Sequence, residues 1–392
     1  MTAGAATPVD VLDSVDGWID RQRLAEDHWD RRPALLRAPR ARGHAVPFDS
    51  HEVFEGAVAA SHHATADTGE RVRFAVGPRL LTDPGDLLPR PEDGSFAAYD
   101  RRLGRQLGDT PFALVVRELH ARHHPLWARE RAFLAGLWDA IGRPQAPIGT
   151  TLCHGTCTPP RPLPSRPSHH RAATFLYVLH GRPQLRLTGP GDRHWAATAV
   201  PGDLLYWPAD HEHAVHVPRS PTTTVHITVP RTPASLLNHA SPHGTWGSVD
   251  TLVPQSEPPD DLPDTLPPAV AAALHHLRQE ARPTPLHRRL AHEVLRQATD
   301  GGLRPAPAPT RPGYFTDDDA VRATERVLWM PAGGQRLVAA CGHVTRTGLT
   351  ARELGALITR LNDGEPLPVS ELTPPARRLL ARLAAFRAVE RL

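Results

Sequence analysis

The sequence contains no lysine, and all 45 of its basic side chains are arginines. A lysine Schiff base and the lysine of a phosphate-binding P-loop are therefore excluded. Three cysteines in 392 residues are too few for a disulfide framework. Apolar runs are short, well below the roughly 18 residues of a membrane-spanning helix, so no membrane span is expected.

The N-terminal residues MTAGAATPVD lack the basic and apolar regions of a secretory signal. Together with the scarcity of cysteine, this predicts a cytoplasmic protein. The 45 basic and 42 acidic residues nearly balance, giving a net charge of +3, so nucleic acid is not an expected partner. Hydrophobic residues make up 40% of the chain, which is enough for a sizeable core in two or three domains.

Residues 147–231 have the texture of a β-barrel or sandwich. The segment 173–187 predicts two strands that bend at Gly181, and 195–208 predicts another pair around Pro201 and Gly202. Residues 222–230 alternate cleanly as a last strand. Several short strands at this spacing are typical of a small antiparallel barrel.

The flanking segments predict mixed helices and strands. Expected helices are 48–60, 129–141, Ala269–Arg282, Leu286–Ala298 and 371–386, with another opened by the capping box Thr350–Glu353 and closed by Gly364. Residues 10–37 predict a helix that leads into an extended segment at Ala34–Leu36, and 72–77 and the start of 112–119 predict strands. A hairpin is expected around Gly333 and Gly334. These elements divide the chain into a barrel domain (1–236), a helical segment (237–300) and a helix-plus-hairpin domain (301–392).

Four segments resemble motifs of the JmjC-type cupins of the ribosomal oxygenase family. In chain order they are HWDRRPALLR (28–37), RPSHHRAATFLYVLHGRPQLRL (166–187), GDLLYWPADHEHAVHVP (202–218) and TTTVHITVPRTPASLL (222–237). The resemblance extends to the helical segment and the C-terminal domain, so it covers nearly the whole chain. It implies an α+β fold: a double-stranded β-helix, a helical dimerisation segment and a C-terminal winged-helix domain.

The resemblance also implies a chemistry, the hydroxylation of protein side chains by Fe(II) and 2-oxoglutarate. In that family a His-x-Asp pair and a distant histidine bind the metal and leave positions open for 2-oxoglutarate and oxygen. Residues i and i+2 of a strand point to the same face, so both members of the pair reach one ion. His213 matches the distant histidine, and His226 matches a family histidine near the ion.

The His-x-Asp motif itself is altered here. With Phe175 and Gly181 as fixed points, its positions fall on Ser168 and His170. A shift of one residue would bring His169 to the first position and Arg171 to the carboxylate position. His170 and His213 are therefore the principal predicted ligands, and the third ligand is open among His169, His211, His154 and His226.

The expected anchor for 2-oxoglutarate is altered as well. The position two residues after Gly181, which is basic in the family, is Pro183 here. Arg182 and Arg186 are the nearest candidates for binding the distal carboxylate. 2-Oxoglutarate is therefore implied by the resemblance but not by this position.

Three hypotheses remain open. The chain is a dioxygenase with a remodelled metal site, a histidine-rich cupin that uses Fe, Cu, Ni or Zn without 2-oxoglutarate, or a catalytically inactive scaffold that binds peptides or dimerises. The expected partners are a protein or peptide substrate and a second copy of the chain. Two weaker metal hypotheses are a chelate within HEHAVH (211–216) and a zinc site of Cys153, His154 and Cys157 with His169 and His170.

Overall fold

The structure is a computed structural model. It describes residues 9–12, 14–16, 21–38, 47–62, 71–144, 146–158, 172–218, 220–231 and 283–392. The chain forms two compact units, Met1–Pro233 with Gly302–Ala308, and Ala234–Gly301 with Pro309–Leu392. Among the described residues, none of the helices combines the length and the apolar character that a bilayer crossing requires.

A nine-stranded sheet is the framework of the first unit. Its order is β2 (Ser14–Asp16), β3 (Ala34–Arg37), β11 (Leu204–Trp207), β8 (Ala172–His180), β13 (Thr222–Pro230), β7 (Gly149–Gly155), β6 (Phe112–Arg117), β4 (Val72–Val76) and β5 (Arg79–Leu81). Neighbouring strands are antiparallel except β2 and β3.

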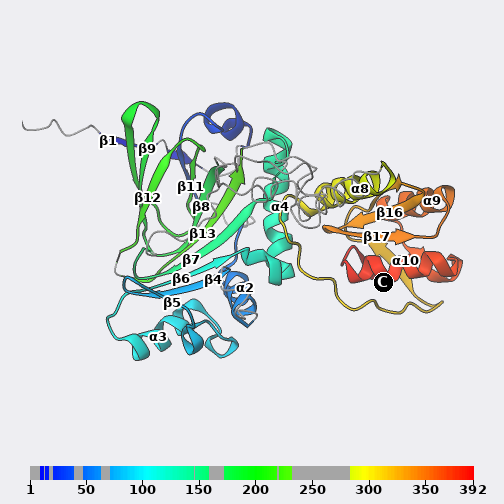
Figure 1. Ribbon diagram of the computed structural model, residues 1–392, viewed down its shortest axis with the longest axis horizontal. Helices are drawn as coiled ribbons and strands as arrows, with labels where there is room; N and C mark the ends of the chain where they lie inside the picture. Colours follow the sequence, from blue (N-terminus) through cyan, green and yellow to red (C-terminus); the bar gives the residue numbers. More distant parts are fainter. Residues whose placement is uncertain are drawn as a thin grey trace, which may run out of the picture. The chain divides into compact units, whose positions relative to one another are not determined.

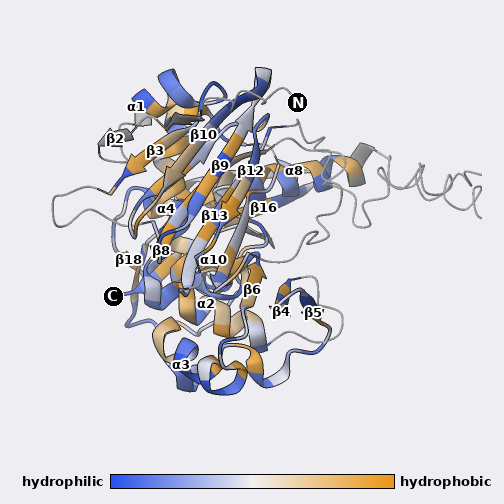
Figure 2. Cartoon of the chain, turned by 90° about the vertical axis from the view of Figure 1, so that its left-hand side faces the viewer, coloured by the Kyte–Doolittle hydropathy of each residue, from blue (hydrophilic) through white to orange (hydrophobic). Residues whose placement is uncertain are grey.

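A four-stranded sheet faces it. Its order is β1 (Val9–Val11), β10 (Arg193–Thr198), β9 (Gln184–Gly189) and β12 (Glu212–His216). Leu185 and Leu187 of β9 join one buried cluster with Leu176 and Val178 of β8 and Trp207 of β11. The two sheets are therefore packed face to face around a shared interior. Hydrophobic and hydrophilic residues alternate along β9, as Figure 2 shows, because one face meets this interior and the other meets solvent.

Helices cover the opposite face of the nine-stranded sheet (Figure 1). They are α2 (Ser50–His62), α3 (Phe96–Leu107) and α4 (His124–Ile141), preceded by α1 (Arg21–Arg23) and the π-helical turn η1 (Leu24–His28). Phe96 of α3 lies 4.7 Å from the His154 ring of β7, and Trp29 stacks on Tyr206 of β11 at 5.6 Å. Short 3-10 turns complete the unit: η3 (Gly85–Leu87), η4 (Pro91–Asp93), η5 (Leu119–Arg122) and η6 (Pro190–Asp192).

The second unit consists of helices around two three-stranded sheets. Its elements are α8 (Pro283–Asp300), β14 (Ala320–Ala323), β15 (Leu328–Ala332), β16 (Gln335–Ala340), β17 (His343–Thr347), α9 (Ala351–Asn362), β18 (Leu367–Pro368), η7 (Val369–Glu371), α10 (Pro374–Ala385) and β19 (Val389–Arg391). Ala291 and Leu295 of α8 pack on Leu337 and Ala339 of β16. The capping box at Thr350 and Glu353 opens α9 as predicted.

Most local predictions are confirmed, and the first one is corrected. The bend at Gly181, the hairpin at Gly333 and the strand 222–230 all form. In residues 10–37 a helical segment does lead into the extended strand Ala34–Arg37, but it is confined to Arg21–His28. The residues before it are strands instead, because Val9–Val11 and Ser14–Asp16 join the two sheets as edge strands. The expected helix Ala269–Arg282 lies outside the described residues. At the level of fold class, the chain is a mixed α and β protein with antiparallel sheets.

Candidate functional site

The interior face of the nine-stranded sheet has an apolar half and a polar half. Paired residues on neighbouring strands point to the same face, so the register defines rows across the sheet. One row runs from Arg117 through Thr151 and His226 to Leu176. The next row runs through Arg73, Val115, Cys153, Thr224 and Val178. The rows end in the leucine-rich cluster on β8 and β11, whereas β4, β6, β7 and β13 present polar side chains.

Charge in the polar half is of one sign. Among the described inward positions of β4, β6, β7 and β13, Arg73 and Arg117 carry the only formal charges, and no carboxylate is present there. Threonines at 151, 224 and 228 and the cysteine at 153 supply neutral polar groups. This half of the interior is therefore suited to a ligand that brings negative charge.

His226 lies in the middle of this polar half. Burial, together with repulsion from nearby His213, lowers the pKa of His226 from 6.5 to about 3. Its Nε2 atom lies 3.3 Å from the hydroxyl of Thr224. The imidazole is therefore neutral at physiological pH, which is the form that binds metals.

His213 reaches the interior from the opposite sheet. It pairs with Leu187, an interior residue of β9, so its side chain shares that face. Its ring lies 4.9 Å from the Trp207 ring. His213 and His226 therefore both project into the interior, from facing sheets. Repulsion from His213 is also the second cause of the lowered pKa of His226. His213 itself is exposed, which leaves this part of the interior open to solvent.

Arg73 is an unusual buried cation. Its side chain is only 8% exposed, and its Nη1 atom has no hydrogen-bond partner in the described part of the chain. Nearby, burial raises the pKa of the Cys153 thiol to about 12, and the positive charge of Arg117 only partly opposes this. Cys153 is thus a protonated thiol and not a ready metal ligand.

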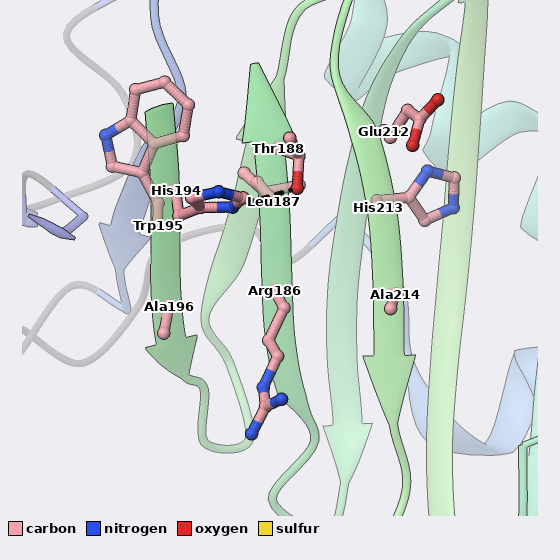
Figure 3. Close-up of a pocket in the computed structure, with 9 residues that line it drawn as sticks. All are labelled: Arg186, Leu187, Thr188, His194, Trp195, Ala196, Glu212, His213 and Ala214. Atoms are coloured by element: carbon pink, nitrogen blue, oxygen red, sulfur yellow. Dashed lines mark hydrogen bonds between the residues drawn. The ribbon is translucent and has the colours of Figure 1, made fainter. Parts of the chain in front are cut away.

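The predicted anchors for 2-oxoglutarate lie elsewhere. Arg182 and Arg186 are both exposed, and Arg186 alternates with the buried Leu185 and Leu187 on β9, so it lies on the solvent face. There it lines a hollow with Thr188, His194 and Glu212 (Figure 3). The placement of Arg186 does not favour its predicted role inside the barrel.

Only some of the predicted metal ligands lie in the part of the chain that the structure describes. His169 and His170 lie outside the described residues, so their positions relative to His213 and His226 stay predictions. Within the described residues, no group of three or more His, Cys, Asp or Glu side chains is arranged to hold a metal. His213 and His226 are two candidate ligands, and at least one further ligand would be needed to complete a site.

The alternative ligands are engaged in other contacts. His154 lies on the helix-covered face, where its Nε2 atom is 2.9 Å from Asp100 Oδ1 and its Nδ1 atom is 2.9 Å from Thr223 Oγ1. Since Cys153 and His154 are successive strand residues, they point to opposite faces, which does not favour the Cys153–His154 zinc hypothesis. His211 places Nδ1 2.8 Å from Asp210 Oδ1.

Sequence reasoning missed the two interior arginines. Both lie in segments that were predicted to be strands, VRFAVG and FALVVREL, and each occupies an inward position. The signal was an arginine inside a strand-like apolar run. It could not be interpreted without the register, because alternation alone does not say which face is the interior.

Neither a protein-family model nor a curated protein sequence matches the chain. The chain is similar to solved structures of YcfD, a ribosomal oxygenase from Escherichia coli. One of them is 14% identical, with 97% of this chain and 99% of that chain covered and a TM-score of 0.49. Another is 16% identical, with coverage of 98% and 100% and the same TM-score of 0.49. A third, also 14% identical with a TM-score of 0.49, covers 96% of this chain and 99% of that chain and is a complex with cobalt and 2-oxoglutarate.

Proposed function

We propose that this chain is a metal-dependent oxygenase that hydroxylates a side chain of a protein or peptide. The observation that supports this most is the placement of His213 and His226 on the inner faces of facing sheets, in an interior that also contains buried positive charge. Two histidines that project from facing sheets into one partly solvent-open interior are typical of a metal site. The resemblance to JmjC-type cupin motifs supplies the oxygenase class.

The donor set fits a divalent metal. His213 and His226 would be two ligands, and His169 or His170 would complete the set from the segment that matches the family's His-x-Asp motif. With imidazole donors and no carboxylate on the described inward positions of β7 and β13, Fe(II) is one candidate, and Cu, Ni and Zn are others. When bound, such a metal would supply the activation of oxygen for attack on the substrate.

The protein's own residues prepare this site. The low pKa of His226 keeps its imidazole neutral and available at physiological pH. The ring of Trp207 packs beside His213 and restricts its orientation. Leu176, Leu187 and their neighbours exclude water from the other half of the interior.

We further propose the fold and assembly that the resemblance implies. The strand orders β7–β13–β8–β11 and β12–β9–β10 in facing sheets are those expected of a double-stranded β-helix. The second unit would include the winged-helix domain, with the dimerisation segment before it. A homodimer that acts on a protein or peptide substrate follows from the same resemblance.

A second candidate function has one specific observation in its favour. The described inward positions of β7 and β13 provide no carboxylate, and an all-imidazole site would not need 2-oxoglutarate. The chain would then be a histidine-rich cupin with another reaction. The inactive scaffold is the outcome if no metal binds.

Metal analysis of purified protein, combined with an assay of 2-oxoglutarate consumption, tests the proposal. Bound iron with consumption is the expected result. Copper, nickel or zinc without consumption would favour the second candidate. If neither a metal nor consumption is found after reconstitution, the oxygenase assignment is contradicted.

A further inference from the structure

The interior has a cationic wall on the β4–β6 side that the proposed metal chemistry does not use. Arg73 of β4 lies in the row of Val115 and Cys153, and Arg117 of β6 lies in the adjacent row beside Thr151. Since Arg117 pairs with Thr151 and lies two positions from Val115, the partner of Cys153, its side chain leaves the sheet on the same face as Cys153. The two arginines thus stand on the same face as His226. Arg117 lies in the row of His226, two strands away, and Arg73 lies in the adjacent row, three strands away.

The buried side chain of Arg73 is the observation that indicates a ligand. A guanidinium carries five N–H donors, and burying it without an acceptor is costly. At 8% exposure, with Nη1 lacking a partner among the described residues, Arg73 has donor capacity that no described carboxylate takes up. A carboxylate is the acceptor that best matches the planar guanidinium, because it accepts two parallel hydrogen bonds.

We propose that Arg73, assisted by Arg117, binds the terminal carboxylate of a small 2-oxo dicarboxylate between the two sheets. This site adds a binding residue to the proposed function. Only the choice of a 2-oxo acid as the ligand rests on that function. It assigns the carboxylate anchor to β4 and β6 and not to the exposed Arg182 and Arg186. The opposite end of the ligand would then point toward His226.

A matched pair of ligands tests the anchor on the wild-type full-length protein. 2-Oxoglutarate and 2-oxopentanoate have the same chain length and differ at one end, which is a carboxylate in the first and a methyl group in the second. Calorimetric titration under nitrogen, with Fe(II) present, measures both affinities without turnover. The wild type is expected to prefer 2-oxoglutarate by about tenfold or more, as a charge-assisted hydrogen bond implies. Equal affinities would overturn the proposal.

Variants assign the preference to a residue. Arg73→Gln is expected to abolish it, and Arg73→Lys, which keeps the charge but loses the fork, to retain part of it. Arg186→Gln, on the solvent face, is the control and should keep the full preference. Loss of the preference in Arg186→Gln but not in Arg73→Gln would refute the assignment.

The wild type also offers a test that needs no variant. If Arg73→Gln does not fold, hydrogen exchange of the peptide that contains Val72–Val76 should slow when 2-oxoglutarate is added and not when 2-oxopentanoate is added. No difference would again overturn the anchor. The anchor and the proposed function can fail separately. If the protein consumes 2-oxoglutarate with iron but its preference for 2-oxoglutarate over 2-oxopentanoate does not depend on Arg73, the anchor is refuted and the oxygenase function is not. If the preference depends on Arg73 but no 2-oxoglutarate is consumed, the oxygenase function is refuted and the anchor is not.

Discussion

Glu130 offers a test of how the interior strands are held in place. This carboxyl of α4 is fully buried and accepts a hydrogen bond from the Thr150 hydroxyl of β7, the strand that presents Thr151 and Cys153 to the interior. Burial raises the pKa of Glu130 from 4.5 to about 8, and the bond from Thr150 only partly opposes this. Neighbouring His120, whose Nδ1 atom is 3.7 Å from Glu130 Oε2, has its pKa lowered to about 4 by burial. Both groups are therefore neutral at pH 7.

The stability cost follows from linkage. In the unfolded chain Glu130 ionises above pH 4.5, while in the folded chain it stays protonated until about pH 8. Stability is therefore lost as pH rises between these values. At pH 7, about 2.5 units above the unfolded pKa, the loss is roughly 3 kcal/mol at about 1.36 kcal/mol per unit.

Glu130→Gln should remove this loss while keeping an acceptor for Thr150. The variant should match the wild type near pH 4.5 and become progressively more stable up to pH 8, by roughly 3 kcal/mol at pH 7. Urea unfolding monitored by circular dichroism across this range measures it. Glu52→Gln, which removes the ion pair of Glu52 Oε2 with Arg129 Nε at 2.6 Å, is the control and should show no such gain. A Glu130→Gln variant that is less stable than the wild type at every pH would mean that Glu130 and His120 form an ion pair, and the reasoning would fail.

Three further predictions concern the histidines and one helix end. His226→Gln should reduce metal affinity at least tenfold, since even mutation of residues that only hydrogen-bond to metal ligands has an effect of that size. His194→Gln, on the solvent face, is the control and should keep the wild-type affinity. Equal metal content in the two variants would exclude His226 as a ligand. Asp100→Ala leaves His154 Nε2 buried without its partner and should cost about 2 kcal/mol in urea unfolding, with metal content unchanged. Thr350→Ala removes the cap of α9 and should lower the melting temperature of the second unit by a few degrees in calorimetry, without affecting ligand binding.

Strand existence and turns could be predicted from sequence because they depend on local signals. The alternation in residues 222–230 and the turn at Gly181, where the backbone φ is 85°, are properties of the segments themselves. The edge strands at residues 9–16 could not be predicted, since their partners β10 and β3 are remote in sequence. Short edge strands form through pairing and not through local preference.

The residues of the candidate site also differ in whether the sequence alone could identify them. His213 and His226 could be named because they lie in recognisable motifs. Arg73 could not, because its importance depends on burial and on the face to which β4 turns it. Arg186 looked equally suitable in the sequence, and only the register of β9 against β12 places it on the solvent side.

The central claim is that His213 and His226 hold one metal ion between the two sheets. The most direct measurement is the metal content of the wild type and of His213→Ala after reconstitution with Fe(II) under nitrogen. The account predicts about one iron per wild-type chain and a large loss in His213→Ala. Full metal content in His213→Ala would contradict it.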